Sequence, residues 1–363
     1  MTLIPSEFKI RFIKRIDSLV GKPITQLFSS PRFYPVDQVQ SILIIRPGGI
    51  GDALLLAPAI NLLRSNYSDA VITILAERRN AGAFSLIPAI DRLLLYDNCR
   101  DLFHCLNSKY DLIIDTEQWH RMSAVIARAV SSQIKIGFDT NERRRLFTHP
   151  VPYSQDDYEA QSFINLLQPL AIRETFSHSR SFLTLPEFAA DEIDSLVGPF
   201  TSPYIAIFPG ASVKERRWSV EKFRSLVQYI ADSGFAAVII GGKEDRNSGE
   251  AILSGTSGLN LAGSTSLAGT AVVIARSRLL VSGDSGVLHI AVGLGIPTVA
   301  LFGAGIAKKW GPQGAMHTVI NRNLACSPCT LFGTTPVCTA AVRCLDEIGI
   351  EEVFEAVKAL LIT

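Results

Sequence analysis

The sequence predicts an α/β protein with two Rossmann-like domains, each a doubly wound parallel sheet, that face each other across a cleft. Short apolar runs alternate with helical patterns along most of the chain, which is typical of such sheets. The length of 363 residues suits two domains of about 150 to 200 residues each. Asp52 and Asp284 each follow an apolar run and open a helical pattern, so both carboxylates are expected at carboxyl ends of strands, where open sheets bind ligands.

The expected strands fall into two groups of five. The first group covers residues 42–45, 71–75, 93–96, 112–115 and 134–138, and the second covers 204–208, 237–240, 259–262, 279–282 and 298–302. A polar stretch over 139–157, a helical pattern over 160–171 and a mixed segment up to residue 203 separate them. We therefore expect a first domain over 41–175, a second domain over 176–345 and a final helix over 346–363, with a basic extension over 1–40.

Composition and charge exclude several classes of protein. The chain has 35 basic and 34 acidic residues, so its net charge gives no signal for nucleic-acid binding. The first residues lack the apolar run and cleavage site of a signal peptide. The uncharged stretch over 286–307 contains His289, Pro297 and several glycines, which favours a helix, a turn and a buried strand over a membrane span. We expect a cytoplasmic protein.

The basic extension lies outside the alternation of strands and helices. Residues 1–32 contain six basic side chains and two acidic ones. Four apolar side chains recur there at helical spacing: Phe8, Phe12, Ile16 and Leu19. One interpretation is peripheral docking on the anionic cytoplasmic face of the inner membrane. The other is a helix that packs on the first domain, and the sequence leaves both open.

A glycine-rich loop precedes Asp52. Gly48, Gly49 and Gly51 allow the backbone to approach a ligand closely, and Asp52 follows near the first turn of a helix. An aspartate there is also favoured as a helix cap, which leaves a purely structural role open. The glycine spacing is not that of a dinucleotide-binding fingerprint.

The second half contains the features that suit a diphosphate. The turn over 209–212 leads into a cationic stretch that includes Arg216, and backbone N–H groups with guanidinium groups neutralise phosphate charge. The helix that begins over 284–286 has free N–H groups at its start, with His289 on its next turn. Glu244 follows another strand, where it can recognise a ribose hydroxyl. The alternative for the cationic stretch is a solvated surface loop.

In this order and spacing, these segments resemble glycosyltransferase family 9, the ADP-heptose lipopolysaccharide heptosyltransferases, from about residue 41 onward. The matching segments are RPGGIGD over 46–52, PGAS over 209–212 with Arg217 and Trp218, TSLAG over 265–269, SGDSG over 282–286 with His289, LFG over 301–303, WGP over 310–312 and the cluster that begins CSPC at 326. The resemblance implies a GT-B architecture, with the donor bound mainly to the second domain and the acceptor to the first.

The resemblance also implies roles for individual residues. Asp52 corresponds to the catalytic base, and Gly49 and Gly51 belong to the acceptor-side loop. Donor contacts are implied at Ser212, Arg216, Glu244, Thr265, Asp284, Ser285, Gly286 and His289. The reaction so implied is one inverting displacement, without a required cofactor or metal, that moves heptose from ADP-heptose to a hydroxyl of a lipid-linked glycan such as the lipopolysaccharide core.

Three departures from the family pattern concern the donor sugar. Arg216 stands where relatives often have lysine, residues 304–306 read Ala-Gly-Ile instead of Thr-Asp-Pro, and Gly48 and Gly49 replace hydroxyl residues. The sequence therefore leaves open whether the donor carries heptose or another nucleotide-activated sugar.

Two other functions share this architecture: a nucleotide-sugar epimerase of GT-B fold and a non-catalytic protein that binds sugar nucleotides. The presence of Asp52 in its loop weighs against the second. The loops over 78–83, 117–121 and 141–145 are expected to face the acceptor, but they name no glycan.

Four cysteines gather near the end of the second domain. Cys326, Cys329, Cys338 and Cys344 have the spacing C-x2-C-x8-C-x5-C, whose leading pair can reach one tetrahedral ion. A structural zinc or iron site is one interpretation, and free thiols in a reducing compartment are the other.

Overall fold

The first half of the chain forms a six-stranded parallel sheet in the order β3-β2-β1-β4-β5-β6. The computed structural model describes residues 17, 21–28, 31, 39–197 and 202–362. The strands are β1 (Ser41–Arg46), β2 (Val71–Ala76), β3 (Arg92–Leu95), β4 (Leu112–Asp115), β5 (Ile134–Phe138) and β6 (His149–Val151). The order reverses between β1 and β4, and open sheets of this kind bind ligands at the carboxyl ends of the strands beside such a reversal.

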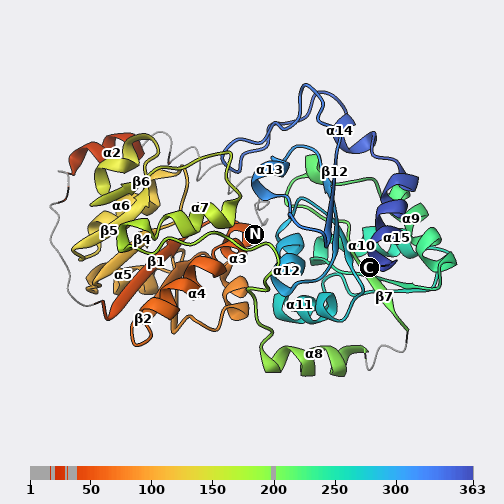
Figure 1. The fold of residues 1–363 in the computed structure, drawn as a ribbon, viewed down its shortest axis with the longest axis horizontal. Coiled ribbons are helices and arrows are strands. Elements are labelled where there is room, and N and C mark those ends of the chain that lie inside the picture. Colours follow the sequence, from red (N-terminus) through yellow and green to blue (C-terminus); the bar gives the residue numbers. More distant parts are fainter. Residues whose placement is uncertain (1–16, 18–20, 29–30, 32–38, 198–201, 363) are drawn as a thin grey trace, which may run out of the picture.

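The second half repeats this winding with the order β12-β11-β10-β7-β8-β9. Its strands are β7 (Tyr204–Phe208), β8 (Ala236–Ile239), β9 (Gly258–Asn260), β10 (Leu280–Gly283), β11 (Thr298–Phe302) and β12 (His317–Asn321). The reversal here lies between β7 and β10, so the segment after Gly283 starts at the corresponding position of the second sheet. Figure 1 shows the two bodies side by side.

Helices cover both faces of each sheet. With the first sheet lie α2 (Lys22–Leu27), α3 (Ile50–Leu55), α4 (Ala57–Asn66), η2 (Ala81–Leu86), α5 (Cys99–Asn107), α6 (Arg121–Ala129), η3 (Asn141–Leu146), α7 (Glu159–Asn165) and η4 (Gln168–Leu170). With the second lie α8 (Glu187–Val197), η5 (Lys214–Arg216), α9 (Val220–Asp232), η6 (Lys243–Asp245), α10 (Arg246–Leu253), α11 (Leu267–Ala275), α12 (Gly286–Leu294), α13 (Ala307–Trp310), α14 (Arg343–Asp346) and α15 (Ile350–Ile362).

The central strands are buried on both faces, which explains their continuous apolar sequences. In β1, Ile42 and Ile44 pack in the cluster that contains residues of α4 and α7, whereas Leu43 and Ile45 pack with residues of α5 and α6. Alternate side chains of a strand point to opposite faces, so a sheet covered on both sides requires apolar residues at every position.

All ten predicted strands are present, and the α/β class with two parallel sheets is confirmed. The prediction missed β6 and β12, which each lie at an edge of a sheet. The sequence of β6 is His-Pro-Val, and β12 is only partly buried, so neither has a continuous apolar run. The boundary proposed near residue 175 stays a prediction.

The described part of the basic extension packs on the first domain. Asp17 Oδ1 accepts hydrogen bonds of 2.8 Å from the backbone N–H groups of both Arg121 and Met122, at the start of α6. Lys22 Nζ lies 3.5 Å from Glu142 Oε1, and α2 contacts α6 and η3. These contacts favour the packed-helix interpretation for residues 17 and 21–28.

The apolar face that the sequence predicts in the extension lies outside the described residues: Phe8, Phe12, Ile16 and Leu19. Within the described ranges, no helix combines the length and apolar character needed to cross a bilayer.

Candidate functional site

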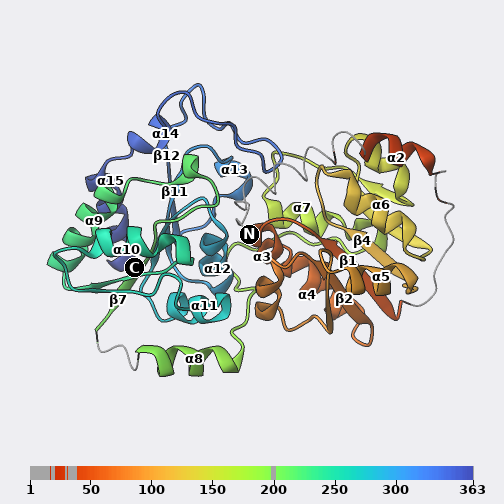
Figure 2. The ribbon, with the colours of Figure 1, turned by 180° about the vertical axis from the view of Figure 1, so that it is seen from behind.

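The two halves meet where α3 begins in the first and α12 begins in the second (Figures 1 and 2). A Cβ atom on Gly51 would lie 2.9 Å from His289 Cδ2, and one on Gly286 would lie 2.9 Å from Ile50 Cβ. Only glycine allows the two helix starts to approach this closely. The contact brings the loop of Asp52 to the loop of Asp284, although more than two hundred residues separate them in the chain.

Asp52 is not the cap of its helix. The N-cap residue of α3 is Gly49, and no side-chain hydrogen bond caps this end. The carboxylate is 26% exposed, and its Oδ2 atom lies 3.7 Å from Nη2 of Arg46. The side chain of Asp52 therefore does not cap α3, although its position in the first turn still suits the helix dipole.

Gly49 and Gly51 of the same loop differ in their surroundings. A Cβ atom on Gly49 would meet nothing within 4 Å, whereas one on Gly51 would meet His289. Gly51 thus serves the contact between the halves, and Gly49 borders open space beside Asp52.

Arg46 holds the Asp52 loop, a role that the sequence analysis missed. It ends β1, and its guanidinium group is 1% exposed. Nε donates to Pro47 O at 2.7 Å and NH1 donates to Thr116 O at 2.8 Å, while NH2 lies 3.3 Å from Glu117 Oε2. The sequence does contain a signal for this role: Arg46 follows directly after the apolar run of β1. A charged side chain in such a buried position needs polar partners.

The turn over 117–119 contains an ionised glutamate, and hydrogen bonds from its backbone hold that carboxylate in place. Burial opposes ionisation of Glu117, but Arg46, with His120 and Arg143, lowers the pKa of its carboxyl group to about 2. Its Oε1 atom accepts hydrogen bonds from the backbone N–H groups of Trp119 and His120 at 3.1 and 3.2 Å. The turn therefore presents fixed backbone at the carboxyl end of β4.

Arg216 and Asp284 form an ion pair at the start of α12. Arg216 NH1 lies 3.0 Å from Asp284 Oδ2, and the aspartate is 6% exposed. A Cβ atom on Gly305 would lie 1.9 Å from the same oxygen, so the glycine that departs from the family pattern is required by the position of Asp284. Ser285 caps α12, since its hydroxyl accepts a hydrogen bond from the Leu288 N–H group at 3.4 Å.

His289 lies under this ion pair, in α12. Its ring is buried, and Nδ1 has no hydrogen-bond partner in the structure. Burial lowers the pKa of His289 to about 4, while Asp284 acts in the opposite direction. The ring is therefore neutral near pH 7, and it faces Gly51 with its Cδ2 and Nε2 atoms.

The remaining predicted donor residues lie at the same edge of the second sheet. Ser212 and Glu244 are exposed and follow β7 and β8, and half-buried Thr265 follows β9, with its hydroxyl 2.8 Å from that of Thr270. The structure thus brings these loops to one edge, where Asp284 forms an ion pair with Arg216.

Asp245, the neighbour of Glu244, organises two of these loops and was missed by the sequence analysis. Its buried carboxylate accepts a hydrogen bond from Gly242 N at 2.9 Å. Cβ atoms on Gly210 and Gly241 would lie 2.5 and 2.7 Å from its oxygens. The two glycine turns that follow β7 and β8 are therefore packed against one buried carboxylate.

A hairpin from the second half reaches the turn over 117–119. Leu331 pairs with Thr334, and Phe332 and Gly333 adopt φ angles of 42° and 68° at its tip. The Phe332 ring stacks on Trp119 with a centroid distance of 4.1 Å. Figure 1 shows this blue segment, between β12 and α14, extending towards the first half.

The four cysteines that surround this hairpin are free thiols. Among the residues that the structure describes, no three His, Cys, Asp or Glu side chains are arranged to hold a metal ion. Burial raises the pKa of the Cys344 and Cys329 thiols, and neighbouring cysteines raise both further. Cys338 Sγ accepts backbone N–H bonds from Ala340 and Val342 at 3.4 and 3.3 Å. The predicted metal site therefore has no ligand set in this structure.

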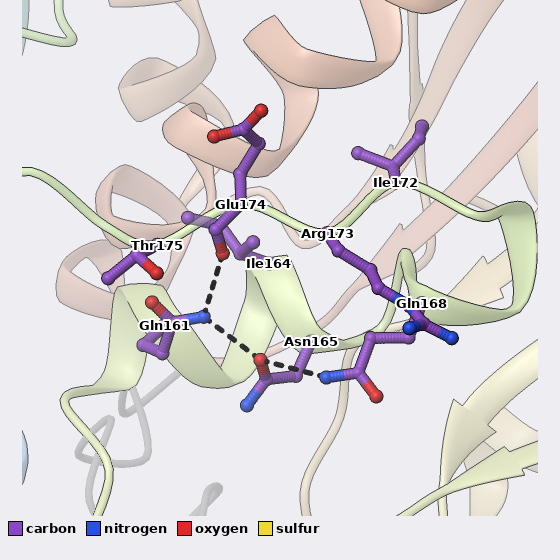
Figure 3. Close-up of a pocket in the computed structure, with 8 residues that line it drawn as sticks. All are labelled: Gln161, Ile164, Asn165, Gln168, Ile172, Arg173, Glu174 and Thr175. Atoms are coloured by element: carbon purple, nitrogen blue, oxygen red, sulfur yellow. Dashed lines mark hydrogen bonds between the residues drawn. The ribbon is translucent and has the colours of Figure 1, made fainter.

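A cavity of about 260 Å³ lies away from the candidate site, between α7 and the segment that follows η4 (Figure 3). In it, Gln161 Nε2 donates to Asn165 Oδ1 at 2.9 Å and to Glu174 O at 3.2 Å. The lining residues are Gln161, Ile164, Asn165, Gln168, Ile172, Arg173, Glu174 and Thr175, and none of them is a predicted site residue.

Comparison with known proteins identifies relatives over most of the chain. Residues 99–335 match the family model described as glycosyltransferase family 9 (heptosyltransferase). Lipopolysaccharide heptosyltransferase 3 of Escherichia coli is 27% identical over 285 residues, which cover 72% of this chain and 83% of the relative. Lipopolysaccharide heptosyltransferase 2 of Escherichia coli K12 is 24% identical over 287 residues, with coverage of 72% and 82%.

Solved structures share the fold. The glycosyl transferase family 9 protein of Veillonella parvula superposes with a TM-score of 0.73 at 21% identity, covering 90% of this chain and 98% of its own. The Escherichia coli ADP-heptose LPS heptosyltransferase II superposes with a TM-score of 0.70 at 21% identity, covering 89% and 98%. The predicted GT-B architecture is therefore confirmed.

Proposed function

Because the chain belongs to glycosyltransferase family 9, the heptosyltransferase family, we propose that it transfers heptose from ADP-heptose to a hydroxyl group of a lipid-linked glycan of the lipopolysaccharide core type. The observation that carries the proposal is the meeting of two helix starts, where Gly51 contacts His289 and places Asp52 beside the loop of Asp284. Relatives named for lipopolysaccharide heptosyl transfer support the choice of donor and acceptor.

The donor half of the site suits a nucleoside diphosphate. Helix α12 begins at Gly286 with free backbone N–H groups, and the positive end of its dipole favours phosphate there. Arg216 adds a guanidinium group at the same place, and its pairing with Asp284 fixes its direction. Glu244, Ser212 and Thr265, on neighbouring loops, are proposed to contact the rest of the nucleotide.

Asp52 is proposed to act as the general base. Its carboxylate takes the proton from the acceptor hydroxyl while that oxygen attacks the anomeric carbon of the donor sugar. The new C–O bond forms as the bond from the anomeric carbon to the diphosphate oxygen breaks, and ADP leaves with the electron pair of that bond. Arg216 and the N–H groups of α12 stabilise the charge that develops on the diphosphate. Attack opposite the leaving group inverts the anomeric configuration.

The chemistry is proposed to need no metal. The cations and backbone donors around residues 216 and 284–286 supply the stabilisation that a metal would otherwise provide. Turnover should therefore survive exhaustive chelation. A structural zinc or iron at the cysteines is tested separately by metal analysis of the purified protein.

The acceptor is proposed to reach the site from the membrane. A lipid-linked glycan lies at the cytoplasmic face of the inner membrane, and the basic extension over 1–40 suits peripheral attraction to anionic lipid. Co-sedimentation with anionic and neutral vesicles, with and without residues 1–16, tests this localisation.

The decisive experiment pairs turnover with nucleotide binding. Asp52→Asn should abolish heptosyl transfer while the affinity for ADP, measured by calorimetry, stays unchanged, because Asp52 lies outside the donor half. Asp69→Asn, an exposed carboxylate of the same half, is the matched control and should keep full turnover. Undiminished transfer in Asp52→Asn would show that another group is the base.

The two alternatives predict different results in the same assays. An epimerase would change the donor sugar without an acceptor, and a binding protein would show ADP affinity without turnover. Calorimetry with ADP-, UDP-, GDP- and CDP-sugars identifies the nucleotide, and preference for a nucleotide other than ADP would overturn the proposed donor.

A further inference from the structure

Lys309, in α13 of the second half, is buried against residues of the first half. Its side chain is fully inaccessible, as is that of Glu159 in α7, and Nζ lies 2.9 Å from Glu159 Oε2. Nζ also donates to Ser154 O at 2.6 Å and to Ser162 Oγ at 2.7 Å, so three partners saturate the three ammonium protons. The ammonium group further lies 4.2 Å from the centroid of the Tyr153 ring. Each of these partners belongs to the first half.

The neighbouring lysine makes a superficially similar contact under different conditions. Lys308 Nζ pairs with Asp156 Oδ1 at 2.7 Å, but the two side chains are 65% and 80% exposed. Such a solvated pair contributes little to stability. A buried ammonium group is costly to desolvate unless its partners are complete, so the fold must preserve the contacts of Lys309 as a unit.

A continuous chain of polar contacts runs from Lys309 to Asp52. Glu159 Oε1 accepts a hydrogen bond from Gln118 Nε2, and Gln118 Oε1 accepts one from Arg46 NH2 at 3.5 Å. Arg46 NH2 in turn lies 3.7 Å from Asp52 Oδ2. The amide of Gln118 therefore points its nitrogen at Glu159 and its oxygen at Arg46.

This orientation depends on the charge of Glu159. An ionised carboxylate only accepts hydrogen bonds, so it holds the nitrogen of the Gln118 amide; a protonated carboxyl group can donate, and the amide can then turn its oxygen towards residue 159. The amide nitrogen of Gln118 would then face Arg46. Both groups are hydrogen-bond donors, so the hydrogen bond between Gln118 and Arg46 would be lost.

The titratable groups that act on Glu159 in the described part of the chain include Lys309, Asp52 and two phenols. The Tyr153 hydroxyl donates to Glu159 at 3.0 Å, and buried Tyr158 is its neighbour in the chain. Burial raises the pKa of Glu159, Asp52 raises it further, and Lys309 is the cation that opposes both.

We propose that Lys309 is a positioning residue for the transfer reaction: docked from the second half, it fixes Glu159, Gln118 and Arg46 so that the Asp52 carboxylate is held for proton abstraction. The inference rests on the proposed role of Asp52. It implies that the base is assembled only when α13 is seated in the first half, although Lys309 touches neither donor nor acceptor.

The test compares Lys309→Met with Lys308→Met, which removes the adjacent charge at the surface. Both variants are first checked for folding by circular dichroism and thermal unfolding. Lys309→Met should lower kcat by about tenfold or more, because small displacements of a catalytic group are costly, while ADP affinity stays unchanged. The acidic limb of its kcat profile should move to higher pH, because Glu159 then holds a proton more readily. Lys308→Met should keep the kcat and pH profile of the wild type.

A double variant separates the network from simple packing. In Lys309→Met with Glu159→Gln, the new amide oxygen can still accept from Gln118, and no charge is left buried alone. The double variant should therefore recover part of the kcat lost in Lys309→Met. A double variant no more active than Lys309→Met, or a folded Lys309→Met with the kcat and pH profile of the wild type, overturns the inference.

Asp52→Asn, assayed in parallel, distinguishes the two levels of the proposal. An inactive Asp52→Asn beside a fully active Lys309→Met overturns the positioning role alone. Full turnover in Asp52→Asn overturns the proposed base, and the positioning role with it.

Discussion

Gly51 of the first half faces His289 of the second, so closely that a Cβ atom on the glycine would lie 2.9 Å from His289 Cδ2. The imidazole ring is buried and cannot swing into solvent. The distance between the two helix starts, and with it the distance between the proposed base and the donor loop, is therefore set by a position that accepts only hydrogen as a side chain.

Gly51→Ala should lower kcat strongly and leave ADP affinity nearly unchanged. The added methyl group forces α3 and α12 apart, and a displacement of about 1 Å can cost about a hundredfold in rate. Steady-state kinetics with calorimetry of ADP binding measures both effects. The control is Gly49→Ala, whose Cβ atom would meet nothing within 4 Å of protein. Equal losses in the two variants would show that the loop, and not the contact with His289, limits the reaction.

Arg216→Ala should weaken ADP binding by about tenfold to a hundredfold, since a hydrogen bond to a charged group contributes about 1.5 to 3 kcal/mol. It should also destabilise the fold, because Asp284, at 6% exposure, loses the cation that lies 3.0 Å away. Calorimetry and chemical unfolding measure the two effects, with exposed Lys214→Ala as the matched control. Unchanged ADP affinity in Arg216→Ala would place the diphosphate elsewhere.

The strands could be predicted from the sequence because most of them are buried on both faces. Residues 42–45 of β1 and all five residues of β7 are buried and apolar, which gives a continuous apolar run, whereas edge strands β6 and β12 have mixed sequences. The loops of Asp52 and Asp284 could be found because each follows such a run. Their contact through Gly51 could not, since no local pattern records which residues face each other across two domains.

The supporting residues of the site could not be predicted for a related reason. Lys308 and Lys309 are adjacent residues of the same type, yet the side chain of Lys308 is exposed and that of Lys309 is completely buried. Glu244 and Asp245 are likewise adjacent acids, and only the fold shows that Asp245 packs against the glycine turns. Burial of a charged side chain is decided by tertiary packing, which a single sequence does not display.

Stability should fall as the pH is lowered from 6.5 towards 4. Burial lowers the pKa of His289 from 6.5 to about 4, and burial with His178 nearby lowers that of His317 to about 4. Between pH 6.5 and pH 4 these histidines are protonated in the unfolded chain but not in the folded chain. The free energy of unfolding therefore decreases with falling pH. Each histidine contributes about 3 kcal/mol at most over this window.

Denaturant unfolding at several pH values between 6.5 and 4 measures this slope. His317→Gln removes one of the two groups, and its stability should depend less steeply on pH than that of the wild type. A wild-type free energy of unfolding that stays constant across the window would contradict the burial of neutral histidines.

Phe332→Ala should raise the KM of the acceptor without changing ADP affinity. The Phe332 ring stacks on Trp119 at a centroid distance of 4.1 Å and lies 6.3 Å from the Tyr153 ring, so it orders the turn that is expected to face the acceptor. Removal of the ring costs an aromatic contact of about 0.5 to 1.5 kcal/mol, which corresponds to a change of about twofold to tenfold. Leu331→Ala, at the adjacent position of the same hairpin, is the control because its side chain is 67% exposed. The measurement is kinetics with acceptor varied at saturating donor, followed by the reverse. If Phe332→Ala raised the KM of the donor and not that of the acceptor, the hairpin would belong to the nucleotide-binding half of the site.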